Sequence, residues 1–264
     1  MTSESRSVIC SRCGASVDTP EASFCPICGA PLRKDRDDIT WSVSDVFKVL
    51  LLSFLVFIPS IIAIATFTYI ILSNIDLFGS FLTSFTFISL FHVILLSFTI
   101  FYLKRRGGSF KSIGFKKADR RAVAVGIVSG LITVIANILI SMLLQPIIGA
   151  SPIQEEMYKL ISKPSMQIAM AIFSIIIAPL VEEVYFRGFS YQAFRKSWGV
   201  KMAIPLCSIF FSILHMDPWS IPNTFIAGMI LTLVYEKTRN LNATVVAHSV
   251  NNLLALLIYL AYTS

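Results

Sequence analysis

The chain has 264 residues, of which 55% are hydrophobic and only 14% are charged, and its mean hydropathy is +0.76. A soluble domain needs more charge than this to cover its surface, so the composition excludes a soluble globular protein. The formal net charge of +7 indicates contact with anionic lipid head groups rather than with nucleic acid, because no aromatic and basic pattern of a nucleic-acid module accompanies it.

The first element along the chain is a pair of Cys-x-x-Cys knuckles within residues 10–32, each followed by a glycine. Glycine permits the tight turn of a knuckle, and four thiolates complete a tetrahedral zinc shell. Residues 1–32 are therefore predicted to form a zinc ribbon that is structural or binds a protein partner, with a pair of disulfides as the alternative. The predicted ligands of the structural zinc are Cys10, Cys13, Cys25 and Cys28.

A charged linker over residues 33–46 leads into long uncharged blocks. Apolar stretches of more than about 18 residues are typical of transmembrane helices. We expect an all-α polytopic membrane protein with about seven spans, or about eight if Pro59 divides the first apolar run, and no cleaved signal peptide. The expected spans cover residues 47–73, 80–103, 122–148, 165–188, 200–216, 220–236 and 241–262.

The membrane orientation is predicted from a basic loop over residues 103–122, which carries eight Lys and Arg against one Asp. By the positive-inside rule this loop lies in the cytoplasm, and counting back two spans places the N-terminus there as well. We therefore expect a multi-pass protein of a prokaryotic plasma membrane, with its cysteines in the reducing cytoplasm.

The fourth expected span ends with two adjacent glutamates and an arginine, in a setting where a buried charge costs several kcal/mol. Glu183 and Arg187 are i, i+4 neighbours on a helix and are expected to form an ion pair. Glu182 points about 100° away, has no local partner and is free to take up protons. Taken alone, this group is equally well explained as a cluster at the cytoplasmic membrane surface.

All three histidines fall in apolar segments, where histidine is rare. Phe211 and His215 are one helical turn apart in the fifth expected span, and His248 and Asn252 are one turn apart in the last. His92 lies in the second span, matches no motif and is predicted to be structural. A single histidine of this kind is more often a packed, hydrogen-bonded residue than a functional one.

Three motifs fit the patterns EExxxR, FxxxH and HxxxN, namely EEVYFR at 182–187, FSILH at 211–215 and HSVNN at 248–252. Together and in this order they resemble the CPBP family. That family contains the type II CAAX prenyl endopeptidases and the bacterial Abi proteins linked to bacteriocin processing and immunity. The resemblance covers residues 120–260 and leaves out the ribbon and the first two spans.

The resemblance implies an intramembrane endopeptidase that hydrolyses membrane-associated or lipidated peptides. Glu182 then activates a water as general base, His215 helps to hold that water, and His248 with Asn252 stabilises the oxyanion. The site is supported by Glu183, Arg187 and Phe211. Residues 47–120 become two accessory helices with a basic cytoplasmic loop, and residues 121–264 become the protease core.

Two questions stay open at this point. Glu182, His215 and His248 are also a possible ligand set for a catalytic metal, although metal-free catalysis is favoured. The alternatives to an enzyme are a non-catalytic immunity or scaffold protein of the same fold and a proton-coupled transporter.

The expected span boundaries also place Glu182 and His215 on opposite sides of the membrane midplane. For these two residues to meet, either the fourth span runs deeper past Arg187 or the fifth extends past His215. We expect the second, because the fifth span is short.

Overall fold

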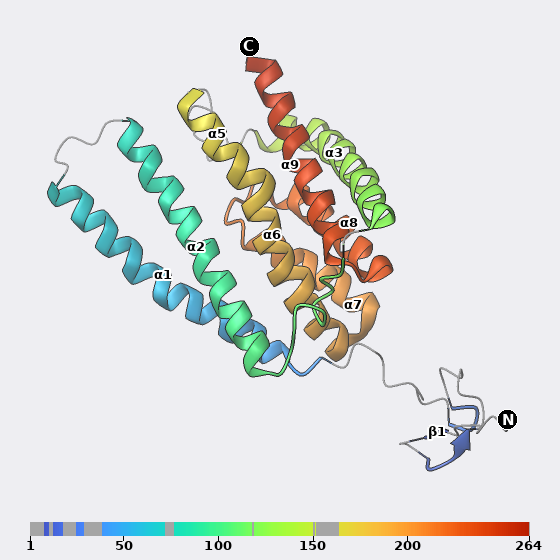
Figure 1. Ribbon diagram of the computed structural model, residues 1–264. Helices are drawn as coiled ribbons and strands as arrows, with labels where there is room; N and C mark the ends of the chain where they lie inside the picture. The colour runs from blue at the N-terminus through green and yellow to red at the C-terminus, as the bar shows by residue number, and fades with distance from the viewer. Residues whose placement is uncertain are drawn as a thin grey trace. The chain divides into compact units, whose positions relative to one another are not determined.

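A computed structural model describes residues 8–10, 13–17, 25–28, 39–71, 77–117, 119–149, 151 and 164–263. It divides the chain into two compact units, residues 1–39 and residues 40–264, which are treated separately below (Figure 1).

The smaller unit contains an antiparallel pair of two-residue strands, β1 (Val8–Ile9) and β2 (Ser16–Val17). Between them the backbone N–H of Gly14 donates to Cys10 O at 2.9 Å, and Gly14 has a φ of +72°, a conformation that glycine adopts without steric cost. The first cysteine knuckle is therefore the turn of a β-hairpin, as its glycine predicts.

The larger unit is helical, and its helices are hydrophobic on most faces, as expected of helices that contact lipid. Its first helices are α1 (Val43–Ile71), α2 (Leu77–Arg105) and α3 (Arg120–Ile148). They are followed by α5 (Pro164–Ile172), the π-helix η1 (Phe173–Ile177), α6 (Ala178–Glu183), the π-helix η2 (Val184–Tyr191), α7 (Gln192–Ile213), α8 (Ile221–Thr238) and α9 (Leu241–Thr263).

Among the described residues, five helical stretches are long and apolar enough to cross a membrane. They are Val43–Phe67, Phe85–Arg105, Arg120–Ile148, Met166–Ile213 and Leu241–Ala261. The chain is thus a multi-pass, all-α membrane protein, as predicted. The sixth expected span forms as α8 but is not one of the five, because its 18 residues include Asn, Thr, Glu and Lys.

The fourth and fifth expected spans belong to the single stretch Met166–Ile213, which bends at Gly199, where φ is +75°. Beyond this bend α7 runs back along η2, since Cys207 Sγ donates to Phe186 O at 3.4 Å and the rings of Phe186 and Phe211 are 4.9 Å apart. The two spans therefore form a helical hairpin that closes at Gly199.

This hairpin resolves the expected conflict between the membrane depths of Glu182 and His215. Glu182 lies seventeen residues before Gly199 and His215 sixteen residues after it, so both reach the same level of the bundle. The expectation that the fifth span extends past His215 was wrong. The helix of the fourth span instead continues past Arg187 to the bend, while α7 ends at Ile213 and His215 lies in the following turn.

Helices α3 and α9 pack against each other through two glycines one turn apart. A Cβ atom on Gly126 would lie 2.8 Å from Ala243 O, and one on Gly130 would lie 2.7 Å from Ala247 O. Only glycine leaves room for so close an approach of two helix backbones, as in GxxxG pairs of membrane helices. This contact fixes α9, which carries His248 and Asn252.

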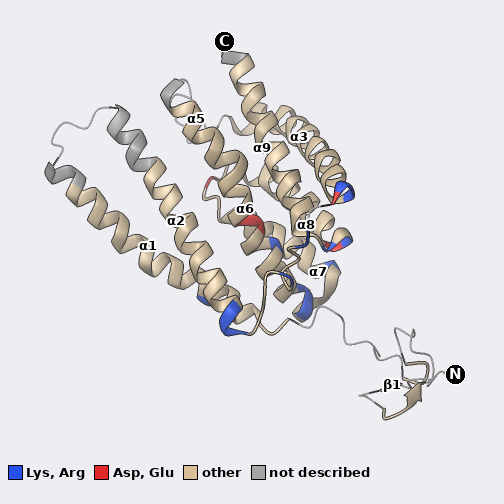
Figure 2. Cartoon of the chain, in the orientation of Figure 1, with Lys and Arg blue, Asp and Glu red and all other residues tan. Residues whose placement is uncertain are grey.

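The beginning of α1 is tied to η2 by buried contacts. Trp41 Nε1 donates to Phe189 O at 2.8 Å, and the hydroxyl of Tyr185 donates to Val46 O at 3.1 Å. Figure 2 shows most Lys and Arg near helix ends and in loops, and acidic residues on α6 in the middle of the bundle. The larger unit therefore carries the carboxylates of α6, together with the buried Arg187 of η2, among mostly apolar helices.

Candidate active site

Glu182 and Glu183 end the six-residue helix α6, which has a π-helix on either side, η1 and η2. π-helical segments are rare and occur frequently at functional sites. Each π-helix widens the helical turn locally and so changes the direction of the side chains next to it. Glu182 and Glu183 lie between the two π-helices and contact His92 of α2 and His248 of α9. The site is thus built on an irregular part of the helix.

Pro179 explains how η1 connects to α9. In a π-helix the N–H of residue 179 would bond to the carbonyl of residue 174, five residues earlier, but proline has no N–H. Ser174 O is therefore left for another donor, and the side-chain amide of Asn252 fills this place at 2.8 Å. The carbonyl that Pro179 leaves free thus orients Asn252.

The expected ion pair of Glu183 and Arg187 is present and completely buried, with Nη1 2.7 Å from Oε1. The same Oε1 accepts a hydrogen bond from Nδ1 of His248 at 2.9 Å. Arg187 also donates to Gly228 O of α8 at 3.4 Å. The first and third motifs are therefore joined by one buried carboxylate, and this pairing is what makes so costly a burial of charge tolerable.

Phe211 connects the second motif to this network. Its ring lies 4.4 Å from the guanidinium carbon of Arg187, a cation–π contact, and its carbonyl accepts a hydrogen bond from Nδ1 of His215 at 2.8 Å. The Phe211 ring also lies against the rings of His215 and His248, with centroid distances of 4.6 and 6.0 Å. Phe211 thus packs against every motif and orients His215.

Glu182 has a partner that the sequence did not indicate. Its Oε1 lies 3.2 Å from Nε2 of His92, which comes from α2. Glu182 was expected to have no local partner, and the partner that the structure adds is a distant residue, His92, which was predicted from the sequence to be structural. No spacing rule links residues 92 and 182, and only the rarity of histidine in a membrane helix could have drawn attention to His92.

The other carboxylate oxygen of Glu182, Oε2, is buried and makes no hydrogen bond within the described part of the chain. Nε2 of His248 lies 3.9 Å from it, too far for a direct hydrogen bond. A buried carboxylate oxygen without a donor is costly, so this atom calls for a water or a substrate group.

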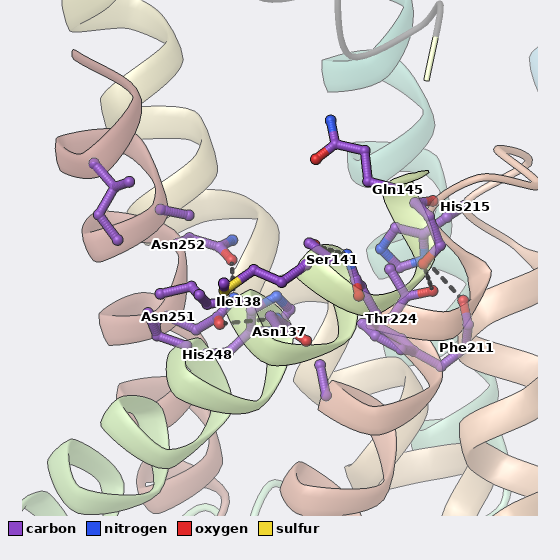
Figure 3. A pocket seen from close by; sticks show the side chains of 17 residues that line it. Asn137, Ile138, Ser141, Gln145, Phe211, His215, Thr224, His248, Asn251 and Asn252 are labelled. Atoms are coloured by element: carbon purple, nitrogen blue, oxygen red, sulfur yellow. Dashed lines mark hydrogen bonds between the residues drawn. The ribbon is translucent and has the colours of Figure 1, made fainter. Parts of the chain in front are cut away.

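Two cavities adjoin these residues, and His215 lines both. A cavity of about 360 Å³ is lined by Glu182 and His92 together with mostly apolar and aromatic side chains of α1, α2 and η2. A second cavity, of about 480 Å³, lies among α3, α8 and α9 (Figure 3). Its polar lining includes Asn137, Ser141, Gln145, His215, Asn223, Thr224, His248, Asn251 and Asn252.

The amides in the second cavity form a directed chain. Asn137 donates to Asn251 at 3.3 Å, Asn251 donates to Asn252 at 3.0 Å, and Asn252 donates to Ser174 O. Because a backbone carbonyl only accepts, this last bond fixes the orientation of all three amides. One hydrogen of the Asn252 amide is thus used, and its second is available to a bound molecule.

Within the described residues, one group of side chains is arranged to hold a metal ion, and it is the four cysteines of the smaller unit. Their sulfur atoms all lie within 4.8 Å of one another, and the closest pairs, Cys10 with Cys28 and Cys13 with Cys25, are 3.6 and 3.7 Å apart. Sulfurs around a tetrahedral zinc are about 3.8 Å apart, whereas a disulfide requires about 2.05 Å. The cluster thus fits a metal site and not a disulfide pair.

Glu182, His215 and His248 are not part of this group. Glu182 uses one oxygen for His92, and His248 uses one nitrogen for Glu183.

Comparison with known proteins gives one finding. Residues 164–254 match the model of a family described as type II CAAX prenyl endopeptidase Rce1-like. The matched segment runs from the start of α5 into α9 and contains all three motifs, but it excludes α1, α2 and α3. No curated protein and no solved structure matches the chain.

Proposed function

We propose that the chain is an intramembrane endopeptidase that hydrolyses membrane-associated or lipidated peptides, because residues 164–254 match the model of the type II CAAX prenyl endopeptidase Rce1-like family. The observation that carries this proposal is Oε2 of Glu182, a buried oxygen without a hydrogen-bond donor among the described residues, on a side chain that lines the smaller cavity. A carboxylate in this state is suited to bind a water and to take a proton from it.

The water would be held between Glu182 and His215. Nδ1 of His215 carries its hydrogen toward Phe211 O, which only accepts, so Nε2 is left as an acceptor. One hydrogen of the water then points at Oε2 of Glu182 and the other at Nε2 of His215. Both lone pairs of the water oxygen remain free for attack.

The reaction would proceed in two steps. In the first, the water oxygen bonds to the peptide carbonyl carbon, one water proton passes to Oε2 of Glu182, and the carbonyl oxygen becomes an oxyanion. In the second, the C–N bond breaks and Glu182 returns the proton to the leaving nitrogen. The products are a carboxylic acid and an amine, so atoms and protons balance.

The oxyanion would be stabilised by Asn252 and His248. Asn252 has one amide hydrogen left after its bond to Ser174 O, and such a donor contributes about 3 kcal/mol to catalysis. Nδ1 of His248 is committed to Glu183, so His248 can donate from Nε2 only as the doubly protonated ring. Its place between two carboxylates is compatible with that form.

The cavities support a substrate with an extended peptide part and an apolar part. The polar cavity offers amide and hydroxyl groups that suit a peptide backbone, while the cavity at Glu182 is lined mostly by aromatic and aliphatic groups that suit an apolar side chain or a lipid chain. His215 lines both cavities, and Glu182 lines the apolar one.

In the smaller unit, we propose that the four cysteines bind a structural zinc ion. The sulfur distances given above fit a ZnS₄ shell, and a segment this short buries too little to fold without such a ligand. We place this unit in the cytoplasm, because the loop after α2 and the region around Gly199 are rich in Lys and Arg.

The proposed activity is tested in cells that express the full chain as wild type or as Glu182→Gln at equal, verified levels. The terminal peptides of the membrane fraction are compared by mass spectrometry. Peptide termini that appear only with the wild type support the protease and identify its substrate. If no terminus depends on Glu182, the chain is a scaffold or immunity protein that keeps the fold.

A further inference from the structure

His92 is a polar group of the site that the family match does not cover, and it contacts Glu182 directly. It lies in the middle of α2, which packs against α6 and η2, and α2 is outside residues 164–254. Its side chain is 12% exposed and that of Glu182 is 16% exposed, so their contact is largely shielded from solvent. Among the described residues, His92 is the one hydrogen-bond partner of Glu182.

The orientation of the His92 ring is fixed by its surroundings. Nδ1 lies 2.8 Å from the carbonyl of Ile88, one turn earlier in α2. The ring also makes edge contacts with Phe173 and Phe91, with centroid distances of 5.0 and 6.2 Å. These contacts hold the imidazole so that Nε2, and not Nδ1, meets Glu182.

The hydrogen positions follow from this geometry. Ile88 O can only accept, so Nδ1 of His92 carries a hydrogen. Nε2 then faces a carboxylate oxygen at 3.2 Å, and two bare lone pairs at this distance would repel each other. A second hydrogen therefore lies between Nε2 of His92 and Oε1 of Glu182.

A hydrogen shared in this way makes the two oxygens of Glu182 unequal. Oε1 is held by His92, whereas Oε2 is buried without a hydrogen-bond partner among the described residues. Without His92 the carboxylate could rotate about its terminal torsion, which is broad and roughly two-fold for glutamate. His92 thus decides which oxygen meets the water and in which direction it points.

We propose that His92 is a positioning residue for catalysis, which holds Oε1 of Glu182 so that Oε2 is presented to the attacking water. This inference rests on the proposed protease activity. It assigns α2 a part in the active site, although α2 lies outside the segment that carries the three motifs.

The test uses the purified full-length protein in detergent and an internally quenched peptide that ends in farnesylated Cys-Ala-Ala-Met, a prenylation signal. The variants are His92→Phe, which keeps the ring and removes the hydrogen bond, and His92→Gln, whose amide nitrogen can take the place of Nε2. Val93→Ala is the matched control, because Val93 is the neighbour of His92 in α2 but its side chain is 61% exposed and does not line this cavity.

We expect His92→Phe to lower kcat by about 10- to 100-fold with little change in KM, because a misplaced base slows the chemical step and not binding. His92→Gln should recover most of this loss, and Val93→Ala should leave kcat within about 3-fold of the wild type. Thermal unfolding of each variant shows whether the fold is kept, and His92→Gln remains informative if His92→Phe does not fold.

The inference is overturned if His92→Phe cleaves as fast as the wild type, or if Val93→Ala loses as much activity as His92→Phe. It is also overturned if His92→Gln, unfolding at the wild-type temperature, is as slow as His92→Phe. Glu182→Gln is measured in parallel. Should it still cleave the peptide, the proposed function fails as well, whereas a dead Glu182→Gln with a fully active His92→Phe refutes the role of His92 alone.

Discussion

Two parts of the larger unit meet at Glu182, and they differ in how they hold their polar groups. Within residues 164–254, Glu183 and Arg187 are fully buried and linked to Phe211 and His248 by short contacts. Helices α1 and α2 are mostly lipid-facing and give the site a single polar side chain, His92. The first part is a buried network of several contacts, in which Oε2 of Glu183 and Nε of Arg187 have no hydrogen-bond partner among the described residues, and the second is one contact beside it.

This difference separates stability from catalysis. A buried network of charged groups loses stability when one member is removed, since a charge is left without a partner. The single contact of His92 with Glu182, the proposed base, mainly affects the direction in which the carboxylate points. The substitutions below test whether the two parts behave in these two ways.

The largest effects on kcat and on the free energy of unfolding are expected when the adjacent glutamates are each replaced by glutamine. Glu182→Gln should lower kcat by about 1,000-fold or more. It should leave the unfolding temperature near that of the wild type, because Glu182 lies outside the buried network of Glu183, Arg187, Phe211 and His248. Glu183→Gln should lower the free energy of unfolding by about 3 to 5 kcal/mol, because Arg187 is left buried without a counter-charge.

Both variants are measured by cleavage of the farnesylated peptide and by thermal unfolding in detergent. Equal losses of stability for the two would contradict the distinction between the network and the base.

A smaller effect on kcat is expected when Asn252, which lines the polar cavity, is replaced. Asn252→Ala should lower kcat by about 100-fold, because one oxyanion donor contributes about 3 kcal/mol. Its neighbour Asn251 lies one step further along the amide chain, so Asn251→Ala should lose less than about 10-fold. Steady-state kinetics on the same peptide give both values, and the reverse order would argue against Asn252 as the donor.

The support from α3 can be tested through the glycines that bring it close to α9. Gly130→Val should destabilise the protein by about 1 to 3 kcal/mol, because the new side chain meets Ala247 O, a backbone atom that cannot move aside. Ile127→Val, on an exposed position of the same helix, is the control and should be almost neutral. A Gly130→Val protein of wild-type unfolding temperature would show that the close helix contact is not required.

The smallest effect on cleavage is expected from removal of metal. The cysteine cluster belongs to a separate compact unit, so a chelator such as 1,10-phenanthroline should unfold the smaller unit and leave kcat within about 2-fold. Zinc release and cleavage are followed in the same sample. Loss of cleavage in step with zinc release would link the metal to catalysis and contradict the metal-free mechanism.

Several features of this molecule could be predicted from the sequence because they depend on local spacing. The zinc knuckles, the membrane class and the pair of Glu183 with Arg187 all follow from residues within a few positions of one another. The bend at Gly199 was missed, since its polar and basic surroundings are typical of a loop and hide a continuing helix. The spacing of helical turns gave no hint of η1 and η2 either.

His92 could not be predicted for a different reason. It meets Glu182 across ninety residues, and such a contact depends on how α2 packs against α6 and η2 rather than on any pattern along the chain. The contact of Asn252 with Ser174 O is similar, although Pro179 is a signal that a carbonyl one turn earlier lacks its usual donor. Motifs identify the residues of a site, and packing determines their partners.

The central claim is that a water activated by Glu182 cleaves the peptide bond, and a single-turnover reaction in H₂¹⁸O tests it most directly. Wild type and Glu182→Gln are each mixed in excess with the farnesylated peptide, and the new carboxyl terminus is examined by mass spectrometry. We predict one ¹⁸O atom in the wild-type product and no product with Glu182→Gln. An unlabelled product in the first turnover, or labelled product formed equally fast by Glu182→Gln, would contradict the account.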